Sequence, residues 1–276
     1  EHFWPFLANV AYGVTSGLDV QTSTTDIFVY QDLVEAGRMI GLRAWSTGPG
    51  VFSDTAIKSK DHAVDVLTRY KDHYRTKNIK AYITGNRKRR QYIIEAAKEV
   101  GVMPTTEGGL DAKLDLTHMI DGFAGNEHNL PIIPLYKDTV ELAAQTGIGY
   151  TPTLLVTYGG PFGENYFFTN MNPHDDEKMN RFMPHGVMDA ATKRRSWFRA
   201  EEYSFTRVAD SAIKIQRAGG KVGVGSHGQF QGLGYHWEMW ALGSGNATPM
   251  EVLKAATIDG AHIIGHGNEV GSIEAG

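Results

Sequence analysis

The chain has 276 residues, which suits one large domain, because barrels of alternating strands and helices commonly reach roughly 250 residues. Hydrophobic residues make up 41% and charged residues 21%, which allows a sizeable core and excludes wholesale disorder. The net charge of −4 argues against a general nucleic-acid binder, no apolar run approaches the roughly 18 residues of a membrane span, and the absence of cysteine excludes disulfides and thiolate metal sites.

The two remaining global features concern the cell compartment and the ends of the chain. The lack of cysteine suits an oxidising compartment, which slightly favours a periplasmic or secreted location over a cytoplasmic one. The chain opens at Glu1 rather than Met, and no signal-peptide pattern follows. We therefore expect an excerpt of a longer protein.

Short apolar runs alternate with longer amphipathic stretches along the chain. The apolar runs predict seven strands, over 14–20, 42–46, 79–83, 102–107, 123–128, 150–158 and 221–225. Helical spacing follows each of them, over 27–37, 61–74, 87–100, 110–120, 135–145, 201–218 and 248–264. Such alternation indicates an α/β fold with parallel strands and outer helices. Seven strands are one short of a (β/α)8 TIM-type barrel, and an open doubly wound sheet is the other option.

One segment, 159–200, breaks this rhythm. It has no clean periodicity, and it is rich in aromatic residues and proline. Because it follows a predicted strand, it would cover the carboxyl end of a barrel, where active sites lie. We predict a long loop or lid insertion here, within a single domain over 1–276; a covering without function is the alternative.

Four residues at the ends of predicted strands carry the candidate chemistry. They are Lys80, Glu107, His128 and His227. A lysine inside an apolar strand is costly unless it is paired or modified, and carbamylation would turn it into a carboxylate able to bridge two metal ions. Glutamate and histidine offer ligands suited to zinc and similar ions. Any one of the four alone would more often be structural, but together they favour a shared site.

The stretches 150–166 and 227–240, with the weaker ones given below, resemble the amidohydrolase superfamily, in its imidazolonepropionase-like branch. More narrowly, the chain is similar to bacterial amidohydrolases fused to a Tol-type β-propeller. The most specific stretches are 150–166 and 227–240. The full set is 11–15 with Asp19, Pro104 with 107–109, 121–122 with 127–128, 150–154, 158–160, 163–166, 227–229, 232–234, 236–240, and 255–257 through 271–276.

The resemblance implies a (β/α)8 barrel whose strand 1, with its His-x-His metal ligands, is missing from this segment. The seven predicted strands would then be strands 2 to 8. This register places Lys80 on strand 4, Glu107 on strand 5, His128 on strand 6 and His227 on strand 8. Two of these depart from the superfamily pattern, which has histidine near Glu107 and aspartate in place of His227. Metal number and identity are therefore left open.

The resemblance also implies the activity. It is that of a metal-dependent hydrolase that cleaves an amide-type C–N bond of a peptide, amide or cyclic amide with metal-activated water. The cofactor would be one or two divalent ions, most simply zinc, with Lys80 carbamylated if it bridges two ions. His227 is the expected catalytic base and a metal ligand, beside Lys80, Glu107 and His128. Tyr158, Tyr166 and His236 are expected to bind substrate, although His236 fits a packed helix equally well.

Two other functions stay open from the sequence. One is a degenerate, non-catalytic barrel that binds a ligand or partner, and the other is a carbohydrate-active barrel with Glu107 and Glu127 as paired carboxylates. We expect a small-molecule or peptide substrate, no nucleic acid and no membrane span. The resemblance implies a β-propeller and a small β domain in the intact chain, and it leaves a homo-oligomer open.

Overall fold

The computed structural model describes residues 3–20, 24–51 and 57–275. Within these ranges the chain forms seven strands, and every strand pair is parallel. The strands are β1 (Ser16–Asp19), β2 (Arg43–Ser46), β3 (Asn78–Lys80), β4 (Met103–Thr106), β5 (Gly125–Glu127), β6 (Gly149–Thr151) and β7 (Lys221–Val222). Each overlaps one of the seven runs predicted as strands, so the predicted alternation is confirmed.

Helices surround the strands. They are α1 (Trp4–Ala11), α2 (Asp26–Glu35), α3 (Lys60–His73), α4 (Arg87–Val100), α5 (Ala112–Asp121), α6 (Lys137–Thr146), α7 (Gly163–Asn170), α8 (Glu177–Phe182), α9 (His185–Thr192), α10 (Phe205–Arg217), α11 (Leu233–Gly243), α12 (Pro249–Lys254) and α13 (Gly260–Ile263). Short 3₁₀ turns form η1 (Leu154–Val156), η2 (Pro173–Asp175) and η3 (Ala200–Glu202), and a π turn, η4 (Ala255–Asp259), joins α12 to α13. The predicted helices correspond to α2–α6, α10 and α12–α13.

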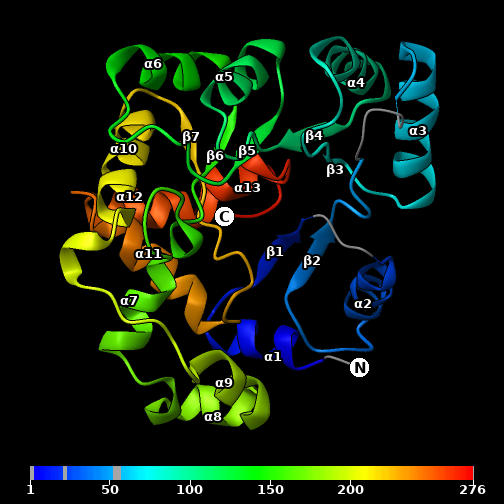
Figure 1. Ribbon diagram of the computed structural model, residues 1–276. Coiled ribbons are helices and arrows are strands. Elements are labelled where there is room, and N and C mark those ends of the chain that lie inside the picture. The colour runs from blue at the N-terminus through cyan, green and yellow to red at the C-terminus, as the bar shows by residue number, and fades with distance from the viewer. Residues whose placement is uncertain (1–2, 21–23, 52–56, 276) are drawn as a thin grey trace.

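The strands form two separate sheets. One pairs β1 with β2, and the other has the order β3-β4-β5-β6-β7 (Figure 1). The barrel is not closed among the described residues. Two hydrogen bonds nevertheless join the end of each strand to the chain flanking the other, from Val51 N, after β2, to Lys80 O at 2.8 Å and from Thr76 Oγ1, before β3, to Ser46 O at 2.5 Å. Sequential order within the five-stranded sheet brings the carboxyl ends of β3, β4 and β5 to one edge.

The outer helices are fixed by their caps and apolar faces, as α4 illustrates. Asn86 caps its amino end by accepting a hydrogen bond from Arg89 N at 3.1 Å, and Gly101 ends it with a φ of 80°. Ile93 and Ile94 are buried in the core, where each side chain contributes about 1.5–3 kcal/mol. The opposite, charged face of α4 can therefore stay in water while the helix supports β3 and β4.

The predicted strand over 150–158 is wrong beyond Thr151. After Pro152, Thr153 has a φ of +47°, and the chain turns into η1. The carboxylate of Glu238 on α11 accepts hydrogen bonds from the two backbone N–H groups that open η1, at 2.6 and 2.9 Å. Because this carboxylate comes from far along the chain, the turn has no local sequence signal.

The 159–200 segment is helical rather than a long loop. It contains α7, α8, α9 and η2, which are too short to show a clear helical period, and it lies next to α1 in Figure 1. Lys178 Nζ donates to Ala11 O at 3.0 Å, which holds α8 against α1. The two ends of the segment meet, since a Cβ on Gly160 would lie 2.8 Å from Ser204 Oγ.

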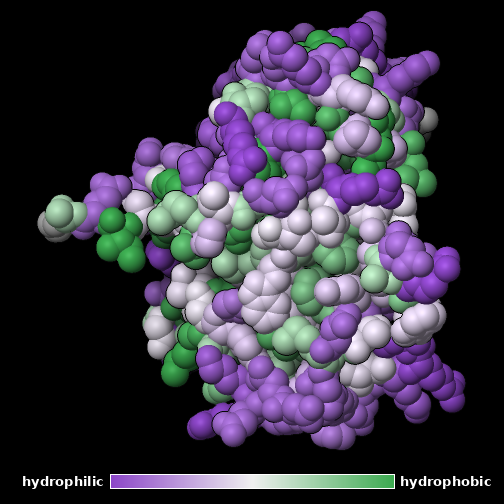
Figure 2. Space-filling model, turned by 90° about the vertical axis from the view of Figure 1, so that its left-hand side faces the viewer, coloured by the Kyte–Doolittle hydropathy of each residue, from purple (hydrophilic) through white to green (hydrophobic). Residues whose placement is uncertain are grey.

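The surface on the side of α6, α7 and α10 is uneven in polarity. Figure 2 shows hydrophilic residues gathered at the two ends of this face, with a paler, less polar band between them. Across the described part of the chain, none of the helices combines the length and apolarity needed to cross a bilayer.

Candidate active site

A buried lysine joins the ends of three neighbouring strands. Lys80, the last residue of β3, is 1% exposed. Its ammonium forms ion pairs with Glu107, which follows β4, at 3.2 Å, and with Glu127, the last residue of β5. A buried ammonium group is costly unless it is paired, and the two carboxylates meet that need. Together with His128 and His227, described next, these residues form what we call the Lys80 cluster.

The two ring nitrogens of His128 contact different residues, one of them in the Lys80 cluster and the other in the turn after β6. Its Nε2 lies 3.2 Å from Glu107 Oε2, and its Nδ1 lies 2.6 Å from Thr153 Oγ1. The Thr153 hydroxyl therefore fixes the ring orientation and leaves Nε2 facing the carboxylate. The turn stabilised by Glu238 is what places this hydroxyl at the site.

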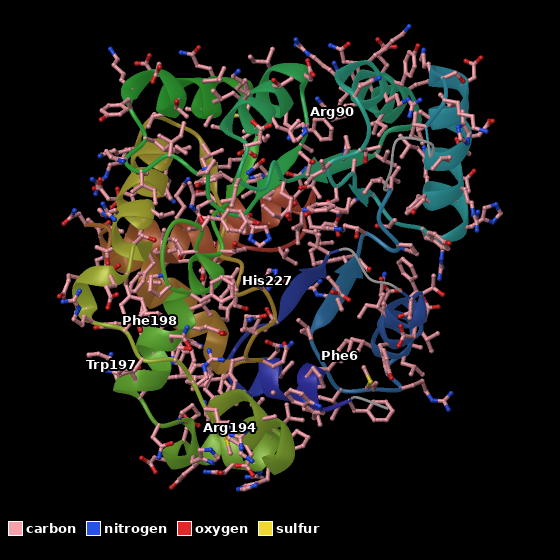
Figure 3. All side chains as sticks on the ribbon, viewed as in Figure 1. Phe6, Arg90, Arg194, Trp197, Phe198 and His227 are labelled. Carbon is pink, nitrogen blue, oxygen red and sulfur yellow. The ribbon has the colours of Figure 1, made fainter. Side chains whose placement is uncertain are left out.

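His227 lies after β7 and is exposed, with its ring centroid 5.1 Å from that of His128. In Figure 3 it occupies the middle of the molecule, between the two sheets. Its Nδ1 lies 3.2 Å from Gln229 Oε1, and Gln229 donates to Glu164 on α7 at 3.3 Å. Tyr158 stacks on His128 at 5.2 Å. The site thus has one solvent-facing imidazole, and side-chain contacts through Gln229 and Glu164 connect it to the 159–200 segment.

The electrostatics of the cluster favour a charged Glu107 carboxylate beside a neutral Tyr158 phenol. Burial opposes ionisation of Glu107, but the hydrogen bond with His128 and the charge of Lys80 outweigh it and hold the pKa of Glu107 below its ordinary value. Burial and the charge of Glu107 raise the pKa of Tyr158 to about 12. Tyr158 therefore keeps its proton at neutral pH and can donate a hydrogen bond.

The structure brings together five of the seven residues that the sequence singled out. Lys80, Glu107, His128, His227 and Tyr158 share the site. The other two lie elsewhere, and in the described part of the chain neither has a hydrogen bond or ring contact with the Lys80 cluster. These two are treated next.

Tyr166 and His236 belong to the packing between helices. Tyr166 packs against Tyr203 and Phe205 and lines a separate cavity of about 340 Å³. His236 lies on α11, and its Nε2 is 2.8 Å from Tyr12 O at the end of α1. His236 thus lies in a packed helix, and the substrate-binding roles of Tyr166 and His236 stay predictions.

Glu127 is the cluster member that was not predicted as a metal-site residue. It was considered only as a carboxylate for sugar cleavage. Adjacent residues of a regular strand point to opposite faces. However, β5 ends at Glu127, and His128 has a φ of +66°, so both side chains reach the same lysine-centred site. The signal available in the sequence was the acidic residue directly before a strand-end histidine.

A second buried acid lies behind the Glu107 turn. Asp115 on α5 is 1% exposed, and its Oδ2 has no hydrogen-bond partner among the described residues. Burial raises the pKa of Asp115 to about 7. Its carboxylate packs against Gly108, where a Cβ would overlap it. Glycine is therefore required directly after Glu107, and Asp115 supports the turn that presents Glu107.

Replacing Asp115 by Asn should make the protein more stable at pH 8 but not at pH 4. The folded protein binds a proton at Asp115 that the unfolded chain releases near pH 4, so this contribution to stability is lost as pH rises through about 7. The gain at pH 8 is at most about 4 kcal/mol, since one pKa unit is about 1.4 kcal/mol. Urea unfolding at both pH values measures it. Asp72→Asn, at an exposed site on α3, should change neither value, and equal effects of the two substitutions would contradict the prediction.

Comparison with known proteins identifies a family for the chain and solved structures of similar fold. The sequence model of the amidohydrolase family matches residues 7–276. The structure is similar to a Xaa-Pro dipeptidase with bound methionine (17% identity, TM-score 0.68, covering 99% of this chain and 69% of the other) and to a putative prolidase from Bifidobacterium longum (17%, 0.65, 99% and 67%). It is also similar to a bottromycin amidohydrolase (17%, 0.72, 95% and 64%).

These likenesses confirm the TIM-barrel type of α/β fold, and they show that the chain spans about two thirds of the length of these structures. No curated protein matches the sequence. The family match covers nearly the whole chain. The chain belongs to the amidohydrolase family, and its fold and family place it among hydrolases of C–N bonds.

Proposed function

We propose that this protein is a metal-dependent hydrolase that cleaves an amide-type C–N bond with water. The observation that carries the proposal is the convergence of Glu107, Glu127, His128 and His227 around Lys80 at the carboxyl ends of the strands. In barrels of this type the carboxyl ends of the strands form the active site.

Two donors of the cluster have the spacing of ligands to one divalent metal ion. Glu107 Oε2 and His128 Nε2 lie 3.2 Å apart, close to the roughly 3.3 Å between two ligands of a tetrahedral zinc ion with bonds of about 2.0–2.1 Å. Glu127, which pairs with the same lysine, would have to move toward this pair to join it as a ligand, and His227 is kept as the proposed base. Lys80 as an ammonium group cannot bind a metal ion, but as a carbamate it would offer oxygen ligands.

When bound, such an ion lowers the pKa of a water molecule and polarises a carbonyl group. The protein's own residues supply the rest. Exposed His227 removes the proton from the attacking water and passes it to the leaving nitrogen. The neutral Tyr158 hydroxyl, beside His128, can donate to the substrate carbonyl oxygen. Thr153 keeps the His128 ring in place during the reaction.

The substrate class we propose is a peptide, an amide or a cyclic amide. Structures described as a Xaa-Pro dipeptidase and a bottromycin amidohydrolase share this fold, and amide cleavage fits a site with paired carboxylates and imidazoles. The experiment is elemental analysis of the full-length protein, followed by a panel of Xaa-Pro and other dipeptides, linear amides and cyclic amides. Each substrate is assayed with and without a chelator.

We expect bound divalent metal, cleavage of at least one member of the panel, loss of activity with chelator and recovery with added zinc. Folded full-length protein that binds no divalent metal would overturn the proposal and favour a non-catalytic binding barrel. Chelator-insensitive cleavage of a glycoside would instead favour the carbohydrate-active alternative with Glu107 and Glu127.

A further inference from the structure

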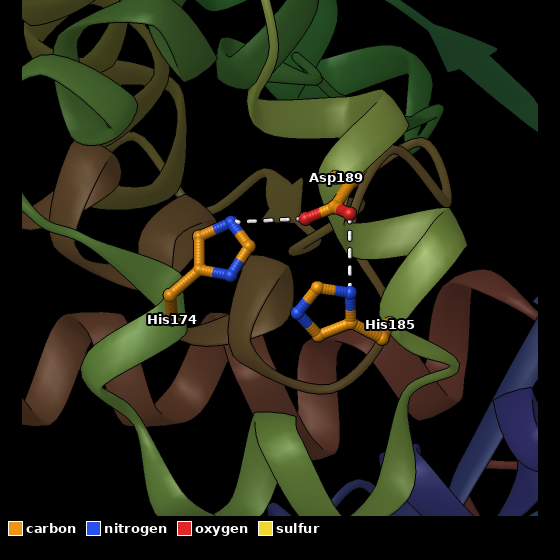
Figure 4. Close-up of side chains that lie close together, drawn as sticks. All are labelled: His174, His185 and Asp189. Carbon is orange, nitrogen blue, oxygen red and sulfur yellow. Dashed lines mark ion pairs between the residues drawn. The ribbon is translucent and has the colours of Figure 1, made fainter.

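Two histidines and an aspartate meet on the surface of the 159–200 segment. His174 lies in η2, and His185 and Asp189 lie one turn apart on α9. Figure 4 shows both imidazole rings beside the same carboxylate. His185 Nδ1 is 3.1 Å from Asp189 Oδ2, and His174 Nε2 is 3.7 Å from Asp189 Oδ1. In Figure 1, α9 lies far from the five-stranded sheet, so this group is separate from the Lys80 cluster.

We propose that His174, His185 and Asp189 form a second metal site, which binds a divalent ion of the zinc type. One ligand atom from each residue lies within 4.8 Å of the other two. The two histidine–aspartate distances end on different oxygens of Asp189, and the shorter is close to the roughly 3.3 Å expected between ligands of one tetrahedral zinc ion. Small rotations of partly exposed side chains would complete the convergence. Among the described residues, this is the one group of three potential ligands that converges so closely.

The chain fixes the elements that carry these ligands. His185 and Asp189 are spaced i, i+4, which places them on the same face of α9. Asn172 caps η2 by accepting from His174 N at 3.3 Å. Thr192 Oγ1, also on α9, lies 3.0 Å from His174 Nε2 and holds the ring beside α9. The two elements are therefore in place before an ion binds, and His174 Nε2 would exchange its contact with Thr192 for the ion.

The donor atoms of His174, His185 and Asp189 determine which kind of ion this site would bind. Two neutral imidazoles and one carboxylate offer nitrogen and oxygen donors with a single negative charge, which suits zinc and related transition metals better than calcium or magnesium. The side chains of His185 and Asp189 are 74% and 49% exposed. Water can therefore complete the coordination from the open side.

A metal ion here would act as a structural link. It would join η2 to α9 and enclose α8 in a short loop of chain. Because α8 contacts α1, the link would also hold α8 and α9 in place against the rest of the protein. The proposed role is thus to stabilise the segment, not to take part in catalysis.

The test compares variants of the full chain after removal of metal by chelator. Zinc sulfate is added to wild type and to three variants, here called the triad variants: His174→Ala, His185→Ala and Asp189→Asn. Bound zinc is then counted by elemental analysis after gel filtration. His73→Ala, at an exposed histidine on α3, is the matched control. Hydrogen exchange of residues 172–192, with and without zinc, locates the binding independently of activity.

Each triad variant should bind one zinc equivalent fewer than wild type and His73→Ala, with affinity at this site weakened at least 10–100-fold. Zinc should slow exchange over 172–192 in wild type and in His73→Ala but not in the triad variants. Equal zinc stoichiometry in wild type and all three triad variants, or exchange of this segment that zinc leaves unchanged in wild type, would overturn the proposal. Neither readout depends on whether the Lys80 cluster is catalytic.

Discussion

Replacing Lys80 by Met should lower the free energy of unfolding of the metal-free protein by about 3–5 kcal/mol. The substitution keeps the volume of the buried stem but leaves Glu107 and Glu127 facing each other without a cation. Each carboxylate then loses its counter-charge in a buried site, and the pair repel each other. Urea unfolding after chelator treatment measures the loss.

The pH dependence of this loss follows from the same charges. Without the ammonium group, burial and mutual repulsion raise the pKa values of both carboxylates in the folded state. An acid with a raised folded pKa is destabilised as pH increases, so the deficit of Lys80→Met should be largest above pH 7 and shrink toward pH 4.

Two further variants make the Lys80 prediction specific. Lys80→Met combined with Glu127→Gln removes one of the opposed charges and should recover part of the loss. Lys77→Met, at a half-exposed lysine on the same stretch of chain, should change stability by less than about 1 kcal/mol. If Lys80→Met is no less stable than Lys77→Met, the buried ion pairs do not hold the strand ends together.

Replacing His227 by Asn should lower kcat about 10²–10⁴-fold while KM changes little, on any substrate that the panel identifies. The imidazole is the proposed proton carrier between water and the leaving nitrogen, and removal of a general base has effects of this size. Asparagine is chosen because His227 has a φ of +59°, a conformation that asparagine tolerates well. The fold should therefore stay intact.

Steady-state kinetics and circular dichroism of wild type, His227→Asn and His73→Asn provide the measurement and its control. His73 is exposed on α3, so His73→Asn should keep the kcat of wild type. An unchanged kcat in His227→Asn would place the base elsewhere in the cluster, and Glu127 would then be the next residue to test.

The sequence predicted the strand–helix alternation because each element carries its own local pattern. The helix over 87–100 illustrates this, since its polar cap, apolar face and closing glycine all lie within the element. Lys80, Glu107, His128 and His227 could be proposed for one site because parallel strands end at one edge. These predictions needed only the hydrophobic period within each element and the order of the elements along the chain.

The features that the sequence missed depend on partners far away in the chain. The turn at Thr153 is set by Glu238, and the place of His236 is set by the carbonyl of Tyr12. His128 joins Glu127 at the Lys80 site because the backbone turns at His128. The short helices of the 159–200 segment gain their stability from tertiary packing, as the buried Met188 of α9 shows, and not from a period of their own.

Gly160 and Ser204 lie side by side, so the 159–200 segment leaves and rejoins the rest of the chain at nearly the same place. This has a consequence for how the protein could diversify. A segment that leaves and re-enters the framework at one point can be lengthened, shortened or exchanged without moving either anchor. The proposed catalytic groups lie at the strand ends, whereas in the described part of the chain the segment reaches His227 through the Glu164–Gln229 contact. Substrate range could thus change through exchange of this one module, while the barrel and its proton chemistry are inherited unchanged.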